Sequence, residues 1–115
     1  MRVLILAKEG EQSDAAKPPT PEAMAEHQKF NEELVKAGVV VGSGRLYPSS
    51  KGKRVRFDGK KRSVIDGPFA ESKELVAGYW IWQVRSMDEA LEWLKRAPYD
   101  DGIFEIREVS MYEGA

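Results

Sequence analysis

The stretch VAGYWIWQVRSMDEALEWL, residues 76–94, decides the predicted fold, because it joins the strongest strand signal of the chain to a well-marked helix start. Aromatic and β-branched side chains favour strands, and they fill most of residues 79–84. Ser86 and Glu89 have the spacing of a capping box, in which a hydroxyl and a carboxylate satisfy free N–H groups at a helix start. The stretch therefore predicts a central strand followed by a helix that Pro98 closes.

The segments on either side predict a matching strand–helix unit and a closing strand. Residues 3–7 are continuously apolar, as in a strand that is covered on both faces. The sequence TPE at residues 20–22 provides an N-cap hydroxyl, a proline at the first helical position and an acid in the first turn. This helix should extend to about Ala37, because Gly38 can adopt the left-handed conformation that ends helices. Residues 102–109, GIFEIREV, alternate as in a half-buried strand.

A weaker strand and a hairpin are predicted between the two units. The β-branched run in residues 39–48 is interrupted by Gly42 and Gly44, which predicts a bulge or a close approach of two backbones. Residues 53–57 and 62–65 flank the turn sequence DGKK and predict a β-hairpin. A chain of 115 residues has the length of a single domain, so we expect one domain over residues 1–115. Its predicted class is α+β, a ferredoxin-like βαββαβ fold with an inserted β-hairpin.

The aromatic strand also predicts an interface. Tyr79 and Ile81 alternate along it with Trp80 and Trp82, so both of its faces are apolar. Two helices cover only one face of such a sheet, and the other face would expose large apolar side chains of the kind that mark interfaces. We therefore expect a homodimer that packs sheet against sheet, since two-fold dimers are the commonest soluble oligomers.

The composition argues against several kinds of site. The chain has no cysteine, which removes disulfides and thiolate chemistry, and it has one histidine and no HxxxH or HxH spacing. We therefore expect no metal and no cofactor, and the VGSGR glycines lack the remaining spacing of a phosphate loop. The basic runs in residues 51–56 and 60–62 fit a solvated hairpin better than a nucleic-acid site. The apolar run near the N-terminus is too short to cross a membrane, so we expect a cytoplasmic protein with no membrane partner.

The stretch VIDGPFAESKEL, residues 64–75, has two interpretations. In the first, a strand ends at Asp66, its carboxylate caps N–H groups of the glycine–proline turn that follows, and Phe69 anchors that turn beneath one helical turn. In the second, Asp66 lies beside a cleft together with Glu71 and Lys73, where an acid and an ammonium group orient a polar ligand. Both remain open at this point.

Three stretches resemble one family. Residues 66–98, DGPFAESKELVAGYWIWQVRSMDEALEWLKRAP, together with EELVKAGVVVGSGRLYP at 32–48 and FEIREV at 104–109, resemble the DGPF-domain proteins of the YCII-related superfamily. The resemblance implies a dimeric α/β barrel. Members are bacterial and many are encoded near alternative sigma factors, which implies a link to transcriptional or stress signalling. YCII-like members are suspected of enzymatic activity through a histidine and an aspartate in the dimer cleft.

His27 matches the family histidine by its place on the first predicted helix. The family's aspartate lies in a DPY-like context near the end of the second helix, where this chain has APYD at residues 97–100, so Ala97 occupies the position of the acid. Asp66 and Asp100 are therefore the alternative acids. His27 falls on the apolar stripe of its helix, where it is either a core residue hydrogen-bonded to a carbonyl or the group that transfers protons near neutral pH.

Polar side chains on the predicted strands complete the expected ligand-binding set. The set consists of Arg45, Glu71, Lys73, Tyr79, Glu105 and Arg107. For Glu105 and Arg107 the alternative is a buried ion pair. The function predicted first is an accessory module that binds a small polar ligand or a regulatory protein. The alternatives are a small cofactor-independent enzyme with His27 as its acid/base group, and a purely structural dimer.

Overall fold

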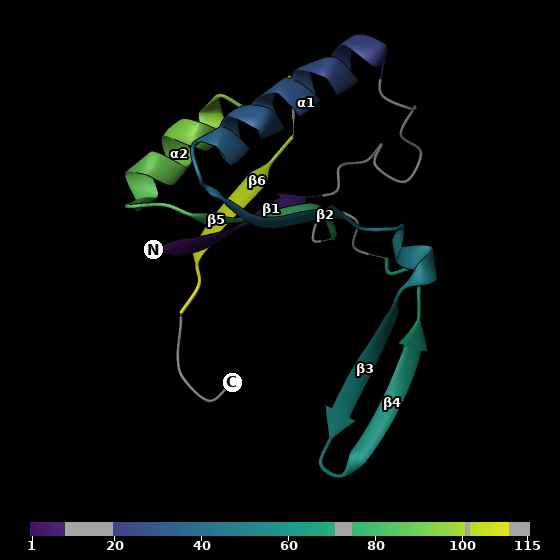
Figure 1. Cartoon of the computed structure of the whole chain (residues 1–115). Helices are drawn as coiled ribbons and strands as arrows, with labels where there is room; N and C mark the ends of the chain where they lie inside the picture. Colours follow the sequence, from purple (N-terminus) through teal and green to yellow (C-terminus); the bar gives the residue numbers. More distant parts are fainter. Residues whose placement is uncertain (9–19, 71–74, 101, 111–115) are drawn as a thin grey trace.

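The elements of the computed structural model follow the predicted order, and the structure describes residues 1–8, 20–70, 75–100 and 102–110 (Figure 1). They are β1 (Arg2–Lys8), α1 (Pro21–Lys36), β2 (Val40–Arg45), the 3-10 helix η1 (Ser49–Lys51), β3 (Lys53–Asp58), β4 (Lys61–Asp66), β5 (Val76–Gln83), α2 (Met87–Lys95) and β6 (Phe104–Glu108). Four strands form an antiparallel sheet in the order β2-β5-β1-β6, and β3 pairs with β4 in a separate hairpin. The α+β class and the inserted hairpin are confirmed, and the interleaved strand order is that expected of a ferredoxin-like arrangement.

Helix α1 begins and ends where its caps predict. The Thr20 hydroxyl accepts a hydrogen bond from the Ala23 N–H at 3.1 Å, and Gly38 ends the helix with a φ of 71°. Phe30 and Leu34 are buried. The predicted apolar stripe is less deeply buried near the start of the helix, where His27, about one turn before Phe30, is only half-buried.

Helix α2 keeps one half of its predicted capping box. The Ser86 hydroxyl accepts a hydrogen bond from the Glu89 N–H at 3.1 Å, as predicted. The Glu89 carboxylate turns instead to Arg85, whose Nε lies 2.7 Å from Oε2. The helix ends at Lys95, three residues before Pro98. Neither of the two helices that the structure describes has the length and apolar content needed to cross a membrane.

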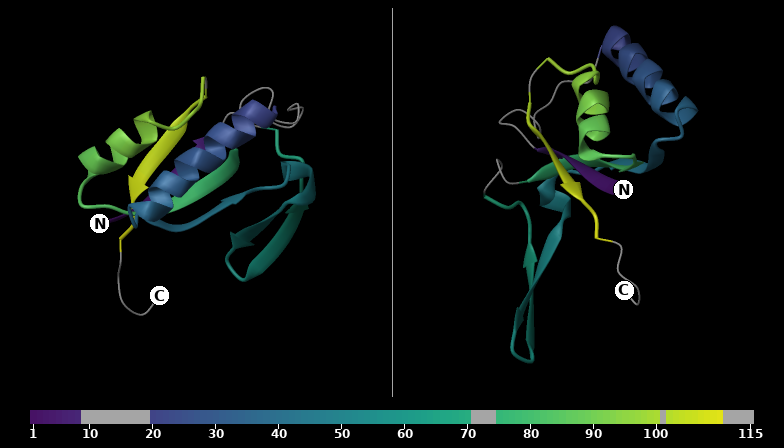
Figure 2. Two further views of the ribbon diagram at one scale, coloured as in Figure 1. Left: turned by 45° about the horizontal axis from the view of Figure 1, so that its top comes forward. Right: turned by 90° about the vertical axis from the view of Figure 1, so that its left-hand side faces the viewer.

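The core lies between the sheet and the two helices, which cover the same face (Figures 1 and 2). Strand register places Val3 beside Trp82 and Ile5 beside Trp80, so these four side chains share the helix side of the sheet. Trp82 has no exposed surface and is the largest fully buried side chain. The buried hydrophobic residues are Val3, Ile5, Phe30, Leu34, Val39, Trp82, Val84 and Ala90.

The opposite face of the sheet is not covered by any helix of the described chain (Figure 2, right). The register places Leu4 beside Ile81 and Leu6 beside Tyr79 on this face. We call this surface, together with the strand β6 residues that follow the same alternation, the open face. Its apolar centre matches the predicted second apolar face of β5.

Strand β2 contains the bulge that its glycines predict, and one of its glycines packs against an aromatic ring. Its register with β5 shifts between Val40 and Gly42, which marks a bulge. Gly44 lies directly against the Tyr79 ring, because a Cβ at that position would lie 2.9 Å from Tyr79 Cε1. Tyr79 can therefore lie flat along the open face over a position without a side chain.

The hairpin, residues 53–66, projects from the sheet on the side opposite the helices (Figures 1 and 2). We call it the arm. Its strands are joined by the two-residue turn Gly59-Lys60, in which Gly59 has a φ of 60°. Two-residue turns of this kind require positive φ, which glycine adopts without strain. Lys53 and Asp66 pair at the base of the arm, and their side chains form an ion pair.

The DGPF motif forms the joint between the arm and η1. The Gly67 N–H donates to the Gly52 carbonyl at 2.9 Å, and the Phe69 N–H donates to the Ser49 hydroxyl at 3.3 Å. A Cβ at Gly67 would lie 1.8 Å from the Ser49 carbonyl oxygen, so no side chain fits there. The peptide bond between Gly67 and Pro68 is cis. The N–H groups of the turn are thus satisfied by η1 and Gly52, while the Asp66 carboxylate binds Lys53 instead of providing the predicted cap.

Candidate functional site

An aromatic cluster occupies the helix side of the sheet around Trp80. The Trp80 ring centroid lies 5.4 Å from that of Trp82, 6.1 Å from Phe30 and 6.2 Å from Phe104, with which it stacks. Tyr99, in the segment between α2 and β6, lies 6.4 Å from Trp80 and 4.6 Å from Phe104. Two strands, a helix and a loop are therefore joined by aromatic contacts in one rigid surface.

His27 lies at the edge of this cluster. Its ring meets Tyr99 edge to face, with centroids 4.7 Å apart and planes at 72°. Helix α1 places it three positions before the buried Phe30, on the same side of the helix. Within the described residues the imidazole contacts this aromatic ring, and no hydrogen bond to a backbone carbonyl is seen. The imidazole is half-buried. An imidazole at the border between protein and solvent can exchange protons with a bound molecule.

Tyr99 contacts His27 and is also affected by the positive charge of Arg45. Tyr99 is 41% exposed, and the burial of the rest of its side chain raises the pKa of the phenol, because the charged phenolate would lose hydration. The positive charge of Arg45 opposes this shift. Arg45 therefore acts electrostatically on the phenol although it belongs to β2, at the far edge of the sheet from β6. At neutral pH the phenol keeps its proton and can donate a hydrogen bond.

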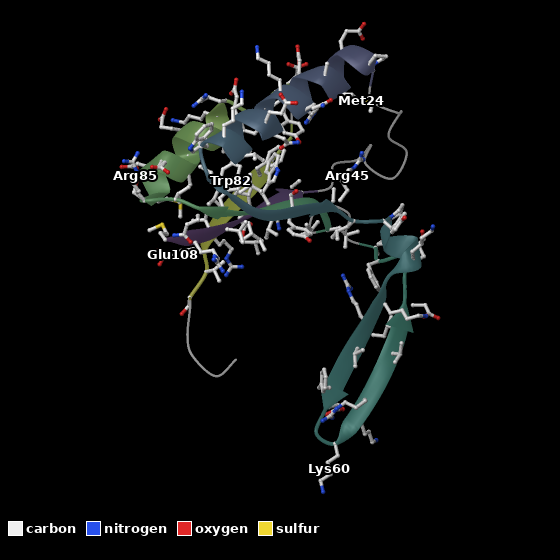
Figure 3. All side chains as sticks on the ribbon, viewed as in Figure 1. Met24, Arg45, Lys60, Trp82, Arg85 and Glu108 are labelled. Carbon is white, nitrogen blue, oxygen red and sulfur yellow. The ribbon has the colours of Figure 1, made fainter. Side chains whose placement is uncertain are left out.

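Arg45 ends β2 and is exposed on the helix side, where Figure 3 shows it pointing toward the layer that contains α1. The register places Arg45 beside Gly78, Gly78 beside Ala7, and Ala7 beside Phe104. This row of the sheet thus has a guanidinium group at one end, an aromatic ring at the other, and only one side-chain carbon between them. A planar guanidinium binds carboxylates and phosphates through two parallel hydrogen bonds.

Asp100 lines a small cavity beside Tyr99. The cavity has a volume of about 240 Å³, and an ammonium group, a carboxylate and a phenol surround it. Its lining residues are Leu94, Lys95, Ala97, Tyr99, Asp100, Gly102 and Phe104. Tyr99 and Phe104 thus belong both to this cavity and to the cluster that His27 contacts, and Asp100, the residue after Tyr99, is the predicted acid that lines the cavity.

The remaining predicted residues lie elsewhere. Asp66 is paired with Lys53 at the base of the arm, and Figure 1 shows the arm projecting away from α1, the helix that contains His27. Tyr79 lies on the open face over Gly44. Glu105 and Arg107 also lie on the open face. Glu71 and Lys73 lie outside the described residues.

Glu105 and Arg107 form an ion pair within β6. The Arg107 Nε lies 3.7 Å from the Glu105 carboxylate, which also receives Lys8 Nζ at 3.6 Å. In the single chain this pair is not buried, because 72% of the Arg107 side chain is exposed. The predicted ligand-binding set is therefore divided between the two faces of the sheet, and Arg45 is its member on the helix side.

A second cavity lies between the end of β2 and the arm base. Its volume is about 380 Å³ and most of its lining is apolar. It is lined by Leu46, Tyr47, Pro48, Ser49, Lys51, Gly52, Phe69, Leu75 and Val76. The lining residues that the structure describes include no histidine and no carboxylate, and they form a mainly apolar packing surface. In the described chain no group of three or more His, Cys, Asp or Glu side chains has a geometry that could hold a metal ion.

Sequence analysis did not identify Tyr99, Phe104 or Lys95 as site residues. Tyr99 belongs to the APYD segment, which directed attention to the acid that Ala97 replaces rather than to the tyrosine. The proximity of this segment to His27, 72 positions earlier, depends on how α1 and the loop after α2 meet on the sheet. No local pattern encodes that contact.

Comparison with known proteins gives one family and one distant relative. The model of the YCII-related domain matches residues 1–113. The uncharacterized protein R00369 of Rhizobium meliloti (strain 1021) is 31% identical over 93 residues, which cover 78% of this chain and 75% of that protein.

Proposed function

The chain belongs to the YCII-related domain family, and from this premise we propose that it is a module that binds a small organic acid on the helix side of its sheet. The strand register carries the proposal, because it places Arg45 on the row of the sheet that ends at Phe104, whose ring centroid lies 4.6 Å from that of Tyr99. Arg45 would bind the carboxylate or phosphate, Tyr99 and Phe104 would contact the apolar part, and His27 would supply a second polar contact. A module of this kind can report a metabolite to a regulatory partner, as the family resemblance implies.

Two arginines on opposite faces of the sheet provide a matched test. A thermal-shift screen of small aromatic and aliphatic acids would be run on the wild type, on Arg45→Ala and on Arg107→Ala. We expect acids that stabilise the wild type to lose this effect in Arg45→Ala and to keep it in Arg107→Ala. A free ligand concentration 100 times Kd stabilises the folded state by about 2.7 kcal/mol, which a shift in Tm reports clearly. Equal loss in both variants, or no stabilisation by any acid, would refute the assignment.

A second candidate function is acid/base catalysis at the same site. The observation that favours it is the direct contact of His27 with Tyr99, which places an imidazole, the side chain most often used in acid/base catalysis, against a phenol. Any stabilising acid would be followed by NMR with the wild type and with His27→Gln, which keeps hydrogen-bonding capacity but cannot transfer protons at neutral pH. Conversion by the wild type and unaltered binding by His27→Gln would indicate an enzyme. Unchanged ligand in both samples would leave a binding module.

We also propose that two copies pack their open faces together. The half-buried row of Leu4, Leu6, Tyr79 and Ile81 supports this assembly, because a sheet face of this character needs a cover.

Sedimentation velocity tests this assembly. We expect the wild type to sediment as a dimer and Ile81→Lys, which places a charge on the open face, to sediment as a monomer. Ile103→Lys is the control, since Ile103 is 71% exposed in the loop before β6. A monomeric wild type, or a dimer that tolerates Ile81→Lys, would contradict the packing of open faces.

A further inference from the structure

The arm exposes apolar side chains, of which Phe57 has the Arg62 guanidinium over its ring at 4.5 Å from the ring centroid. Cross-strand pairing places Val55 opposite Val64, and Phe57 follows on the same side of the ribbon. These side chains are 52%, 64% and 67% exposed, and every residue from Lys53 to Asp66 is exposed. A two-stranded hairpin is only marginally stable alone in water. The arm therefore needs a protein surface against this side, which we call the arm's apolar side.

The direction and length of the arm indicate where that surface lies. In Figures 1 and 2 the arm extends away from the helices, on the side of the open face. Its strands have six residues each, which corresponds to about 20 Å at 3.3 Å per residue. Two sheets packed face to face lie only about 10 Å apart. In a dimer that joins open faces, the arm of one copy would therefore pass the sheet of the other copy and reach its helices.

The charges of the arm and of the helices are complementary. The arm contains six basic and two acidic residues, a net charge of +4. Helix α1 contains four acidic and two basic residues, and α2 contains three acidic and one basic, so each has a net charge of −2 with the histidine neutral. Lys60 lies at the tip of the arm, farthest from the sheet (Figure 3). The most basic part of the chain would thus reach its most acidic elements, which favours association and its correct orientation.

We propose that the arm clasps the helical layer of a second copy of this chain, with its apolar side packed against α1 or α2 of that copy. The inference rests on the proposed packing of open faces and adds a second contact to it. Two-fold symmetry makes the contact reciprocal, so each copy both extends an arm and receives one. The joint formed by Gly67 and Phe69 would then fix the angle at which the arm leaves the sheet, which an arm that holds a partner requires.

A photo-crosslinking experiment tests the clasp. The aromatic crosslinker p-benzoylphenylalanine would replace Phe57, a substitution that keeps an aromatic ring at an exposed site. Unlabelled protein would be mixed with ¹⁵N-labelled protein, irradiated and digested, so that mass spectrometry identifies crosslinks joining a light and a heavy peptide. We expect mixed crosslinks from position 57 to peptides of α1 or α2. The same crosslinker at Ile103, in the loop before β6, should not give this pattern.

The other outcomes separate the clasp from the dimer on which it rests. A dimer by sedimentation without mixed crosslinks from position 57 to the helices would overturn the clasp and leave the packing of open faces intact. A monomeric protein would overturn both. A salt-sensitive complex of the arm with duplex DNA or RNA, lost in Lys60→Glu/Lys61→Glu, would identify the arm as a polyanion-binding ribbon and overturn the clasp. If the clasp exists, the same double variant should weaken dimerisation about tenfold or more at low salt, and less at high salt.

Discussion

Gly67→Ala should detach the base of the arm from η1 while leaving the central sheet folded. The added Cβ would lie 1.8 Å from the Ser49 carbonyl oxygen and 2.7 Å from its carbon. Both are backbone atoms, so the clash cannot be relieved by rotating a side chain. Either the turn or η1 has to move, and the 2.9 Å hydrogen bond from the Gly67 N–H to the Gly52 carbonyl would be strained or lost.

The magnitude follows from these two contributions. Forcing an extra carbon into a filled site typically costs about 1–3 kcal/mol. Loss of the hydrogen bond adds about 1 kcal/mol. Together they amount to about 2–4 kcal/mol, which increases the population of the detached arm at least about 30-fold, since 1.4 kcal/mol is a factor of ten. The destabilisation should be local, because the arm pairs only with itself and joins the sheet through this turn.

Amide hydrogen exchange measures this local effect, and urea denaturation followed by tryptophan fluorescence measures the sheet. Gly42→Ala is the matched control, since a Cβ there would meet no atom within 4 Å and its φ is not positive. We expect the interstrand amides of β3 and β4 to lose protection in Gly67→Ala but not in Gly42→Ala, with a smaller change in the urea midpoint. If both variants exchange at the wild-type rate, the turn is not held in the way that these distances imply.

Three further predictions concern the core, a helix cap and pH. Leu34→Ala should lower the free energy of unfolding by about 2–5 kcal/mol because Leu34 is fully buried, whereas Val35→Ala, 65% exposed, should change it by no more than about 0.5 kcal/mol in the same urea titration. Ser86→Ala should cost about 1 kcal/mol through loss of the α2 cap, and an unchanged urea midpoint would argue against that cap. Burial raises the pKa of Tyr99, so its neutral form stabilises the fold below the unfolded pKa of 10.0, and this contribution is lost as pH rises through the folded pKa. The wild type should therefore lose more thermal stability than Tyr99→Phe between about pH 8 and about pH 11, and parallel losses would contradict this sign.

Local signals were sufficient to predict the elements of the fold. The caps at Thr20 and Ser86 bind N–H groups only three residues away, so their sequence spacing already determines the contact. Gly59 marked the turn of the arm, because that turn requires a positive φ, and the glycines of β2 marked its bulge. Boundaries were less accurate. Helix α2 stops at Lys95, before the proline that was expected to end it.

The site was only partly predictable, because it joins segments that are distant in the sequence. His27 and Arg45 were proposed from their types and places on predicted elements, and both lie on the helix side of the sheet. The contact of Tyr99 with His27 depends on how the loop after α2 packs against α1 and the sheet. The pairing of Asp66, in contrast, was within reach of sequence reasoning. A two-residue turn at Gly59 fixes the register of the hairpin, and that register places Lys53 opposite Asp66.

The geometry of the DGPF motif favours a structural role for the motif itself and leaves the helix side of the sheet as the candidate ligand site. Three of its four residues have a structural role: Asp66 binds Lys53, Gly67 leaves room for the Ser49 carbonyl, and the Phe69 ring centroid lies 3.9 Å from the Arg54 guanidinium. None of these contacts requires a ligand. A motif whose members are already satisfied has little capacity left for chemistry, whereas an exposed guanidinium, a neutral phenol and a half-buried imidazole can still bind a partner molecule. The motif is thus better explained as the joint that directs the arm, and the groups around Tyr99 as the place where a small molecule would act.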